Sequence, residues 1–366
     1  MKTGINHKIR QIWKNGDSAH FSSHIIKWVL SLFSVGYGAA VNLRNRLYDT
    51  GIFKQERLPC KVISIGNITV GGTGKTPLVI MLANFLREKG YRPAVLSRGY
   101  GGQSKSPVNI VSDGSHILMG HVEAGDEPVL IAKSTEGVPV ITGPKRTQTG
   151  GVATEKLGAD VLILDDGFQH RAIFRDVDIV LMNRENSFGN GYLLPRGPLR
   201  EPAESMKRAD LIIWKDNALD GRYPLYQEQG IDKFLPVLSG HLRPKSIVRG
   251  STGESFPLEY IRGKRICAVA GIGSPESFRD TIESIGGVTV SLLPFPDHYR
   301  YTAEDLIDIR EKASAAAAEI IMTTEKDAIR LTDFPDFLKE IYILQVEMEM
   351  LPSQKTFSSL ILEKLR

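Results

Sequence analysis

The chain has 366 residues, of which 42% are hydrophobic and 24% are charged, with 35 Gly and 19 Pro. This length has room for two or three domains with hydrophobic cores, and this composition excludes disordered, collagen-like and low-complexity proteins. The net charge of +4 is uneven, because residues 1–58 hold nine Lys and Arg against three Asp and Glu, which leaves the rest of the chain slightly negative.

An apolar run lies within this basic segment, from Ile25 to Val41, and Arg44 and Arg46 follow it. A membrane-spanning helix needs about 20 mostly apolar residues. This run is too short and too polar for that, because it contains Lys27, two serines and two glycines. It also begins too far into the chain for a typical secretory signal.

Two aromatic residues in the run favour a helix at the membrane interface. Trp28 and Tyr37 are of the kind that prefers the headgroup layer, and the flanking cations attract anionic lipids by roughly 1 kcal/mol each. The alternative is a core helix of an N-terminal helical cap, which the sequence leaves open.

From Pro59 the pattern changes to short apolar runs that alternate with helical segments. Apolar runs without polar alternation predict the strands of a parallel sheet that is covered on both faces. A helix is predicted over residues 78–89. The predicted strands of this α/β domain are Lys61–Gly66, Pro93–Ser97, Val138–Thr142, Val161–Asp165, Asp178–Met182 and Leu211–Trp214.

A looser stretch with several Gly and Pro follows and is predicted to be a linker. A second α/β series begins at Arg265, with strands near residues 288–293 and 320–323 and an alanine-rich helix from Ala303 to Ala318. The predicted organisation is an N-terminal membrane-associating segment 1–58, an α/β domain 59–216, a linker 217–262 and a second α/β domain 263–366.

The strongest chemical signal is the segment 67–77, Asn-Ile-Thr-Val-Gly-Gly-Thr-Gly-Lys-Thr-Pro, between a predicted strand and a predicted helix. In this setting the backbone amides of the loop and the helix start bind phosphate. Lys75 is then expected to reach the terminal phosphates and Thr76 to bind Mg²⁺. The predicted nucleotide-binding residues are Thr69, Val70, Gly71, Gly72, Thr73, Gly74, Lys75 and Thr76.

This loop predicts the fold class. We expect a P-loop NTPase-like, mostly parallel α/β sheet with helices on both faces, a smaller C-terminal α/β domain and an N-terminal interfacial helix. The loop departs from the usual pattern at Thr69, where a Gly is expected. Its glycine spacing resembles the Gly-Gly-x-Gly-Lys-Thr variant of P-loop nucleotidases, although Val70 stands where some of these carry a second lysine. The alternative is a glycine turn that only packs a helix on a strand.

Two carboxylates end another predicted strand, in the sequence Leu-Ile-Leu-Asp-Asp-Gly-Phe-Gln-His at residues 162–170. Carboxylates at the end of a strand beside a P-loop can bind Mg²⁺ or its water molecules. If the strand continues, Asp165 and Asp166 point to opposite sides, so only one of them is expected to face the metal. The alternative is that Asp-Asp-Gly simply begins a turn.

Three further segments, residues 97–102, 125–128 and 194–202, are rich in charge and glycine at predicted ends of strands. In open α/β sheets the ligand lies outside the carboxyl ends of the strands, so we expect these loops to border one cleft. Each loop taken singly is more often a solvated turn than a site.

Together the motifs resemble the tetraacyldisaccharide 4'-kinases, the lipid A 4'-kinases of Gram-negative bacteria, over about residues 60–330. The resemblance implies transfer of phosphate from ATP, with Mg²⁺, to the 4'-hydroxyl of a lipid A disaccharide 1-phosphate, giving lipid IVA. It places the protein at the cytoplasmic face of the inner membrane, as a peripheral or monotopic protein. The motifs that carry it are Gly66–Pro77, Ser97–Gly101, Gly125–Pro128, Asp165–His170, Leu199–Pro202, Phe295–Tyr299 and Thr323–Asp327.

The resemblance also implies residue roles. Asp126 matches the family's proposed base for the sugar hydroxyl and His298 its partner, so the C-terminal domain is expected to close on the P-loop domain and bring them together. A carboxylate suffices as base, because phosphoryl transfer acidifies the alcohol late in the reaction. Mg²⁺ is assigned to Thr76, Asp165 and Asp166, and contacts with phosphate or the disaccharide are assigned to Tyr100, Arg146, Arg200 and Glu201.

Two other functions accept the P-loop. One is a membrane-associated ATPase switch of the partitioning type. Val70 argues against it, because a second lysine is expected at this position in such ATPases. The other is a nucleic-acid-binding ATPase, but no basic stripe with interleaved aromatic residues occurs outside residues 1–58. The expected partners are therefore a glycolipid substrate and the inner-membrane surface, and no nucleic acid.

Overall fold

A computed structural model describes residue 13 and residues 21–184, 187–216 and 235–366. The chain divides into two units. The first unit contains residues 1–75, 163–240 and 350–366, and the second contains residues 76–162 and 241–349. The domain boundaries predicted from the sequence stay a prediction.

Three parallel strands form the centre of the first unit. β6 (Val177–Asn183) pairs with β1 (Lys61–Gly66) on one side and with β7 (Leu211–Asp216) on the other. Nearly every residue of the three strands is buried, as their β-branched, non-alternating sequences predict. The other elements of this unit are the end of β5 (Val161–Asp165), η1 (Ala203–Arg208) and α11 (Gln354–Leu365).

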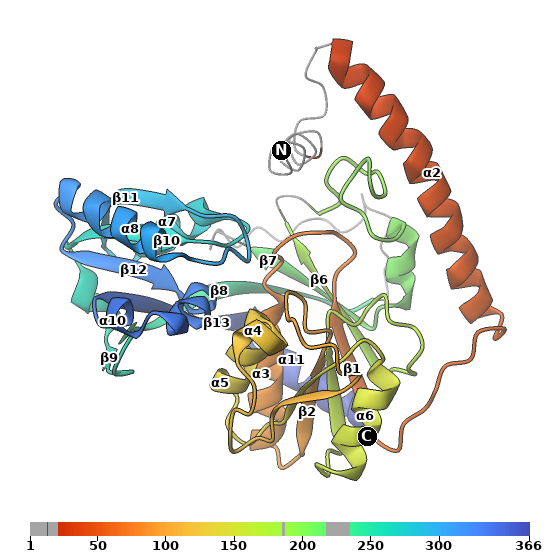
Figure 1. The fold of residues 1–366 in the computed structure, drawn as a ribbon. Coiled ribbons are helices and arrows are strands. Elements are labelled where there is room, and N and C mark those ends of the chain that lie inside the picture. Colours follow the sequence, from red (N-terminus) through yellow and green to blue (C-terminus); the bar gives the residue numbers. More distant parts are fainter. Residues whose placement is uncertain (1–12, 14–20, 185–186, 217–234) are drawn as a thin grey trace. The chain divides into compact units, whose positions relative to one another are not determined.

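The helix α2 (Phe21–Asp49) also belongs to the first unit, and Figure 1 shows it as one long, unbroken helix. It extends eight residues beyond the predicted end at Val41, because polar side chains of its last turns are held by the rest of the unit. Asn45 Nδ2 donates to Glu201 Oε2, and Arg171 donates to Asp49 Oδ1.

In the second unit, β10 (Arg265–Ala270) runs parallel to β11 (Val288–Pro294) and β12 (Ile320–Thr324), and β12 runs parallel to β13 (Ile341–Leu351). Alternate residues of β10 enter two cores. Ile266 packs with residues of α7 (Pro275–Ser284), and Cys267 packs with residues of α8 (Ala303–Ala315). The two helices therefore cover opposite faces of β10 (Figure 1).

The second unit also contains the segment from Thr76 to Leu162. There β4 (Val140–Thr142) pairs in parallel with β2 (Pro93–Ser97) and antiparallel with β3 (Asn109–Ser112). The helices of this segment are α3 (Lys75–Glu88), α4 (His121–Ala124), α5 (Asp126–Ser134) and α6 (Arg146–Glu155). The remaining helices of the unit are η3 (Leu258–Ile261), α9 (Glu325–Arg330), η4 (Leu331–Asp333) and α10 (Pro335–Leu338).

The predicted α/β class is confirmed, since most strand pairs are parallel and helices follow the strands. The predicted linker differs from what the structure shows. Its part 235–262 contains the long strand β8 (Val237–Arg249) and the short strand β9 (Ser255–Phe256), which pairs antiparallel with β8. Residues 217–234 of the predicted linker lie outside the described residues.

Candidate active site

The glycine loop lies between β1 and α3, as predicted. Gly71 and Gly74 have φ angles of 131° and 85°, which residues with a Cβ rarely adopt. A Cβ placed on Gly71 or Gly72 would meet no atom of the described residues within 4 Å. Since the loop faces open space and not a packed neighbour, the structure disfavours the alternative of a glycine turn that only packs a helix on a strand.

A second motif braces this loop. Thr69 and Leu199 form an antiparallel bridge, and Val70 N donates to Pro198 O at 2.8 Å. Arg200 N donates to Ile68 O at 2.7 Å. The segment that contains Leu-Arg-Glu-Pro therefore fixes the shape of the glycine loop through its backbone.

The Asp-Asp-Gly turn approaches the loop from the other strand. Gly167 N donates to Ile65 O at 3.0 Å, and a Cβ on Gly66 would lie 2.5 Å from Cβ of Phe168. Only glycine allows this close approach of the two backbones. The turn is therefore locked against the end of β1, where the glycine loop begins.

Asp166 meets two cations at this point. Its Oδ1 lies 3.3 Å from Lys75 Nζ, and its Oδ2 accepts from Arg200 at 2.7 Å. Burial opposes ionisation, but the charges of Lys75 and Arg200 outweigh it and hold the pKa of Asp166 below its usual range. Asp166 also has a φ of 52°, a conformation that costs energy for a residue with a Cβ and that accumulates at functional sites.

Asp165 is the last residue of β5 and is buried. Because the strand ends there and Asp166 turns away, the strict alternation assumed from the sequence does not extend to Asp166. Among the residues that the structure describes, no group of three or more His, Cys, Asp or Glu side chains could hold a metal ion. Mg²⁺ is commonly held by one or two carboxylates together with substrate phosphates, and the Asp165–Asp166 pair fits that donor set.

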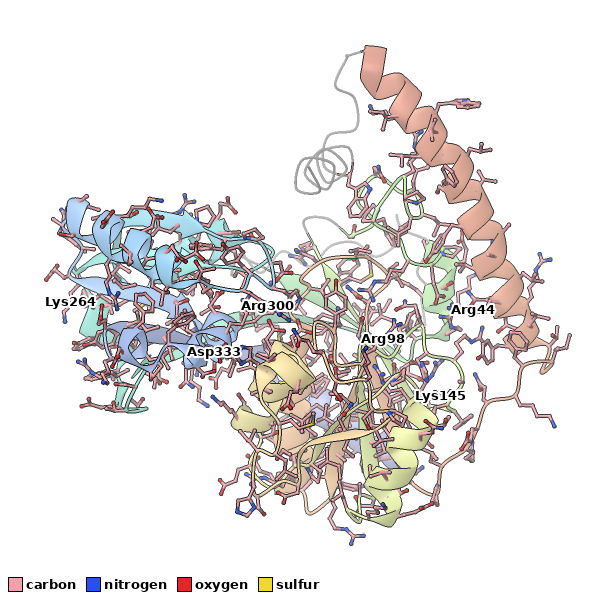
Figure 2. All side chains as sticks on the ribbon, in the orientation of Figure 1. Arg44, Arg98, Lys145, Lys264, Arg300 and Asp333 are labelled. Atoms are coloured by element: carbon pink, nitrogen blue, oxygen red, sulfur yellow. The ribbon has the colours of Figure 1, made fainter. Side chains whose placement is uncertain are left out.

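Glu201 is fully buried in the first unit. Its carboxylate accepts from Arg44 and Arg208 at 2.8 Å each and from Asn45 at 3.1 Å. Figure 2 shows where Arg44 projects from α2. Burial raises the pKa of Glu201, but the two guanidinium groups outweigh this and lower it. The structure gives Glu201 a part in anchoring α2, and the contact with substrate stays a prediction.

The second unit brings Asp126 and His298 together, although 172 positions separate them in the sequence. Nδ1 of His298 lies 3.0 Å from both carboxylate oxygens of Asp126. Burial raises the pKa of Asp126, but the hydrogen bond with His298 and the charges of Lys326 and Arg330 hold it below its usual range. The hydrogen bond to Asp126 raises the pKa of His298, against burial and the charge of Lys326.

The backbone of His298 is also constrained, with a φ of 59°. Its ring packs edge-on against Tyr100, whose side chain is 71% exposed, with centroids 5.4 Å apart. Asp126 is the first residue of α5, and only 5% of it is exposed. Asp166 and His298 thus each have a positive φ, which is a strained conformation for a residue with a Cβ. Each also carries a charged or polar side chain at a predicted site position.

The motif Thr323–Asp327 joins the end of β12 to the start of α9 and contacts His298 through Lys326. Thr323 Oγ1 donates to Val269 O, and Thr324 caps α9 by accepting from Asp327 N. Asp327 is fully buried, and its carboxylate accepts hydrogen bonds from four donors. Those donors are Gly271 N, Tyr301 Oη, Thr324 Oγ1 and Arg330 Nη2.

We expect Asp327→Ala to destabilise the protein by about 3–5 kcal/mol, because it leaves the buried guanidinium of Arg330 without its closest carboxylate. The measurement is urea unfolding followed by circular dichroism. Asp336→Ala, which removes an exposed carboxylate paired with Lys339, is the control and should change stability little. Equal stability of the two variants would contradict this role for Asp327.

Two other predicted positions are less engaged with these groups. Arg146 is buried at the first turn of α6, and its Nη1 donates to Gly143 O at 2.7 Å. Thr76 is the second residue of α3. Their roles toward phosphate and Mg²⁺ stay predictions.

Four charged residues of this site had no predicted role. Lys326 and Arg330 come from α9, Glu127 follows Asp126 on α5, and Asp297 precedes His298. Three of them, Glu127, Asp297 and Lys326, lie inside motifs that the sequence already singled out, so the charge density of these motifs was the available signal. The sequence does not show that α5 packs beside α9, and this packing is what brings these charged residues together.

Comparisons with known proteins follow the same motifs. Residues 26–366 match the family described as "LpxK: Tetraacyldisaccharide-1-P 4'-kinase". A tetraacyldisaccharide 4'-kinase of Syntrophus aciditrophicus is 48% identical over 99% of both chains, and one of Desulfatibacillum aliphaticivorans is 38% identical over 100% of this chain and 99% of its own. The crystal structure of LpxK from Aquifex aeolicus in complex with ATP is 32% identical, with a TM-score of 0.76 over 93% of this chain and 100% of its own.

Proposed function

Because the chain belongs to the tetraacyldisaccharide-1-P 4'-kinase family, we propose that it transfers the γ-phosphoryl group of ATP to the 4'-hydroxyl of a tetraacyldisaccharide 1-phosphate, giving lipid IVA in lipid A biosynthesis. The observation that carries the proposal is the Asp126–His298 pair, which supplies a base for an alcohol. The glycine loop with Lys75 supplies the complementary half of a kinase, a site for phosphates.

In the phosphate half, backbone amides of residues 69–75 bind the phosphate oxygens, and Lys75 neutralises the terminal phosphates. Lys75 and Arg200 both pair with Asp166. Arg200 is suited to bidentate phosphate contact, so we propose that nucleotide or substrate phosphate competes with Asp166 for it.

Mg²⁺ would be held by Thr76 and by Asp165 or Asp166. Asp166 supports this assignment, because its pKa is lowered and it is therefore an anion over the whole neutral range. When bound, Mg²⁺ neutralises charge on the transferring phosphoryl group. The chain's own contribution is to hold these oxygens at the end of β5 against the glycine loop.

In the acceptor half, Asp126 takes the proton of the 4'-hydroxyl and His298 orients its carboxylate. A carboxylate with a lowered pKa is a weak base, which is sufficient when the proton leaves late in a loose transition state. Tyr100 is exposed beside His298, and we propose that its ring contacts the disaccharide.

The helix α2 supports a membrane partner, because it exposes large apolar side chains and buries mostly polar or small ones. Most of the residues that it buries are polar or small, such as Lys27, Ser34 and Asn45, and Val41 is the apolar exception among the described positions. By length and composition, residues 26–49 could cross a membrane, a test that core helices also pass, but only 22% of their most apolar stretch is buried. The large apolar side chains that α2 exposes are Ile26, Trp28, Val29, Leu32, Phe33, Val35 and Leu43.

We therefore propose that this face of α2 lies in the cytoplasmic leaflet of the inner membrane, where the substrate's acyl chains reside. The exposed apolar face favours this location over a core helix, since a core helix turns its apolar face inward. ATP is available on that side of the membrane. The basic residues of the N-terminal segment would add attraction to anionic lipids.

Replacing Leu32 and Phe33 with Gln should weaken binding to vesicles of phosphatidylglycerol and phosphatidylethanolamine more than tenfold, because each buried side chain of this size contributes about 1.5–3 kcal/mol. Both side chains are more than 60% exposed. The measurement is sedimentation with vesicles. Ile307→Gln, on the exposed side of α8, is the control. Undiminished vesicle binding of the double variant would overturn the membrane assignment of this face.

The decisive test of the activity is incubation of the purified full chain with radiolabelled ATP, Mg²⁺ and a tetraacyldisaccharide 1-phosphate in detergent. The expected product carries label at the 4'-position, as mapped by mass spectrometry. Hydrolysis of ATP without transfer to the glycolipid would favour the ATPase switch over the kinase.

A further inference from the structure

We propose that Lys326 is a positioning residue that fixes His298 as the neutral tautomer protonated on Nδ1, which leaves Asp126 as the member of the pair that accepts the substrate proton. The catalytic consequence rests on the proposed function. The tautomer itself is independent of turnover and can be observed in the resting protein.

The hydrogen-bond capacity of Lys326 carries the argument. Its Nζ lies 3.0 Å from Glu127 Oε1, 3.2 Å from Asp297 Oδ1 and 3.2 Å from His298 Nε2. An ammonium group has three N–H donors and no acceptor, so these three partners use all of its donors. Nε2 must therefore be the acceptor, and the proton of the neutral ring is on Nδ1.

The other face of the ring agrees with this assignment. Nδ1 points at both oxygens of Asp126, and an ionised carboxylate can only accept. Burial favours a neutral Lys326, but Glu127, Asp297 and Asp126 outweigh it and raise the pKa of Lys326. Lys326 is therefore a cation and Asp126 an anion at neutral pH, and both neighbours select the same tautomer.

The position of Lys326 is set by the helix that carries it. Asp327, the next residue, is tied to the backbone of Gly271 and to Tyr301, and Thr324 caps the helix. The side chain of Lys326 is 17% exposed, which restricts the space into which it could swing. The motif Thr323–Asp327 thus presents one ammonium group to Nε2 of His298.

The charged groups around His298 come from several elements. Asp126 of α5, Lys326 of α9 and Asp297 of its own loop approach its ring nitrogens, and the Tyr100 ring packs against it from the loop after β2. Glu127 of α5 pairs with Lys326, and Arg330 of α9 lies beside Asp126. Of the two cations, Lys326 touches the imidazole ring, whereas Arg330 lies 3.7 Å from Asp126.

Removal of the Lys326 ammonium should change the pKa of His298 in a predictable direction. Without it, Nε2 is free to take a proton and loses a repelling charge, so the pKa of His298 rises further above its ordinary value. The imidazolium then persists to higher pH beside Asp126, where it stabilises the carboxylate and weakens it as a base. The acidic limb of the kcat/KM profile should therefore move to higher pH in Lys326→Met.

The first test is the tautomer in the unmodified protein. Full-length protein labelled with ¹⁵N-histidine is titrated by NMR in detergent, and His298→Gln assigns the signal among the eight histidines. Above the pKa of His298 we expect a protonated Nδ1 and an unprotonated Nε2. A protonated Nε2 in the neutral ring would overturn the proposal, and this reading needs no variant of Lys326 to fold.

The second test is the pKa of His298 in matched variants. Lys326→Met should raise it by about one unit or more, whereas Lys326→Arg, which keeps a donor-only cation, should stay within about half a unit of wild type. Lys339→Met removes an exposed cation of the same unit and should change nothing. An unshifted pKa in Lys326→Met would overturn the proposal. If the tautomer is as expected but Asp126→Asn keeps full activity, the proposed role of Asp126 fails while the role of Lys326 on the tautomer stands.

Discussion

Replacing Asp126 with Asn is expected to lower kcat by about 10² to 10⁴ with little change in the affinity for ATP. The side chain keeps its shape but can no longer accept a proton from an alcohol. Since Asp126 is proposed to act on the acceptor and is not part of the glycine loop, its loss should leave binding at the glycine loop intact. The measurement is steady-state kinetics with the glycolipid in detergent, together with nucleotide binding at equilibrium.

The surroundings of Asp126 explain why Asn is a better replacement than Ala. Asp126 is 5% exposed, so truncation to Ala would leave a cavity, whereas Asn keeps the volume and shape of the side chain. Because the pKa of Asp126 is lowered, wild-type activity should not be lost through its protonation until the pH falls below the ordinary carboxyl range.

The control for this experiment is Asp308→Asn, on an exposed part of α8 in the same unit. It removes one carboxylate without touching the pair and should leave kcat unchanged. If kcat of Asp126→Asn equals that of wild type, Asp126 is not the base. If ATP affinity falls as strongly as kcat, the variant has damaged more than the acceptor half.

Much of the phosphate half could be predicted from the sequence, because its signals are local. The strand before the loop, the loop's glycines and Lys75 follow each other within 15 residues, and β1 has the predicted bounds Lys61–Gly66. The carboxylate turn was likewise predicted, but its geometry was not. Asp166 turns away from the strand at a positive φ, and no local pattern indicates that Lys75 and Arg200 meet there.

The elements that were missed depend on distant partners. β8 contains Gly240 and Pro244, which weaken a strand signal, and it is stabilised by neighbours such as β13, which contributes Gln345 to Ser246. The last turns of α2 look polar and non-helical by hydropathy. They are helical because Arg44 and Asn45 bind Glu201, more than 150 positions away. Tertiary contacts overrode local propensity in both cases.

The Asp126–His298 pair was predicted in part from the sequence. The resemblance to a family predicted that the two residues act together, and the hydrogen bond between them agrees with it. Lys326 lies inside a motif that the sequence singled out, but no local pattern assigns it a role, because its contact with His298 depends on how α9 packs beside α5. The cation that sets the protonation of the pair thus becomes visible only when the fold has been built.

Replacing Lys75 with Met is expected to lower kcat/KM for ATP by about 10² to 10³, the effect of losing one preorganised donor at a site of developing charge. Lys75 is 14% exposed, and its ammonium lies 3.3 Å from Asp166. The substitution removes the cation and leaves Arg200 as the remaining ion-pair partner of Asp166 among the described residues, so the negative charge near the phosphates increases.

The result should depend on the number of phosphates. Because Lys75 is assigned to the terminal phosphates, Lys75→Met should weaken binding of ATP more than that of AMP, which lacks those phosphates. Lys61→Met, which removes a half-exposed lysine at the start of β1, is the matched control and should bind both nucleotides like wild type. Lys75→Arg should recover part of the loss, since it restores the charge without the compact geometry of an ammonium. Unaltered turnover of ATP by Lys75→Met would mean that the phosphates bind elsewhere, because a loop that faces open space with no functional cation has no advantage over any other turn.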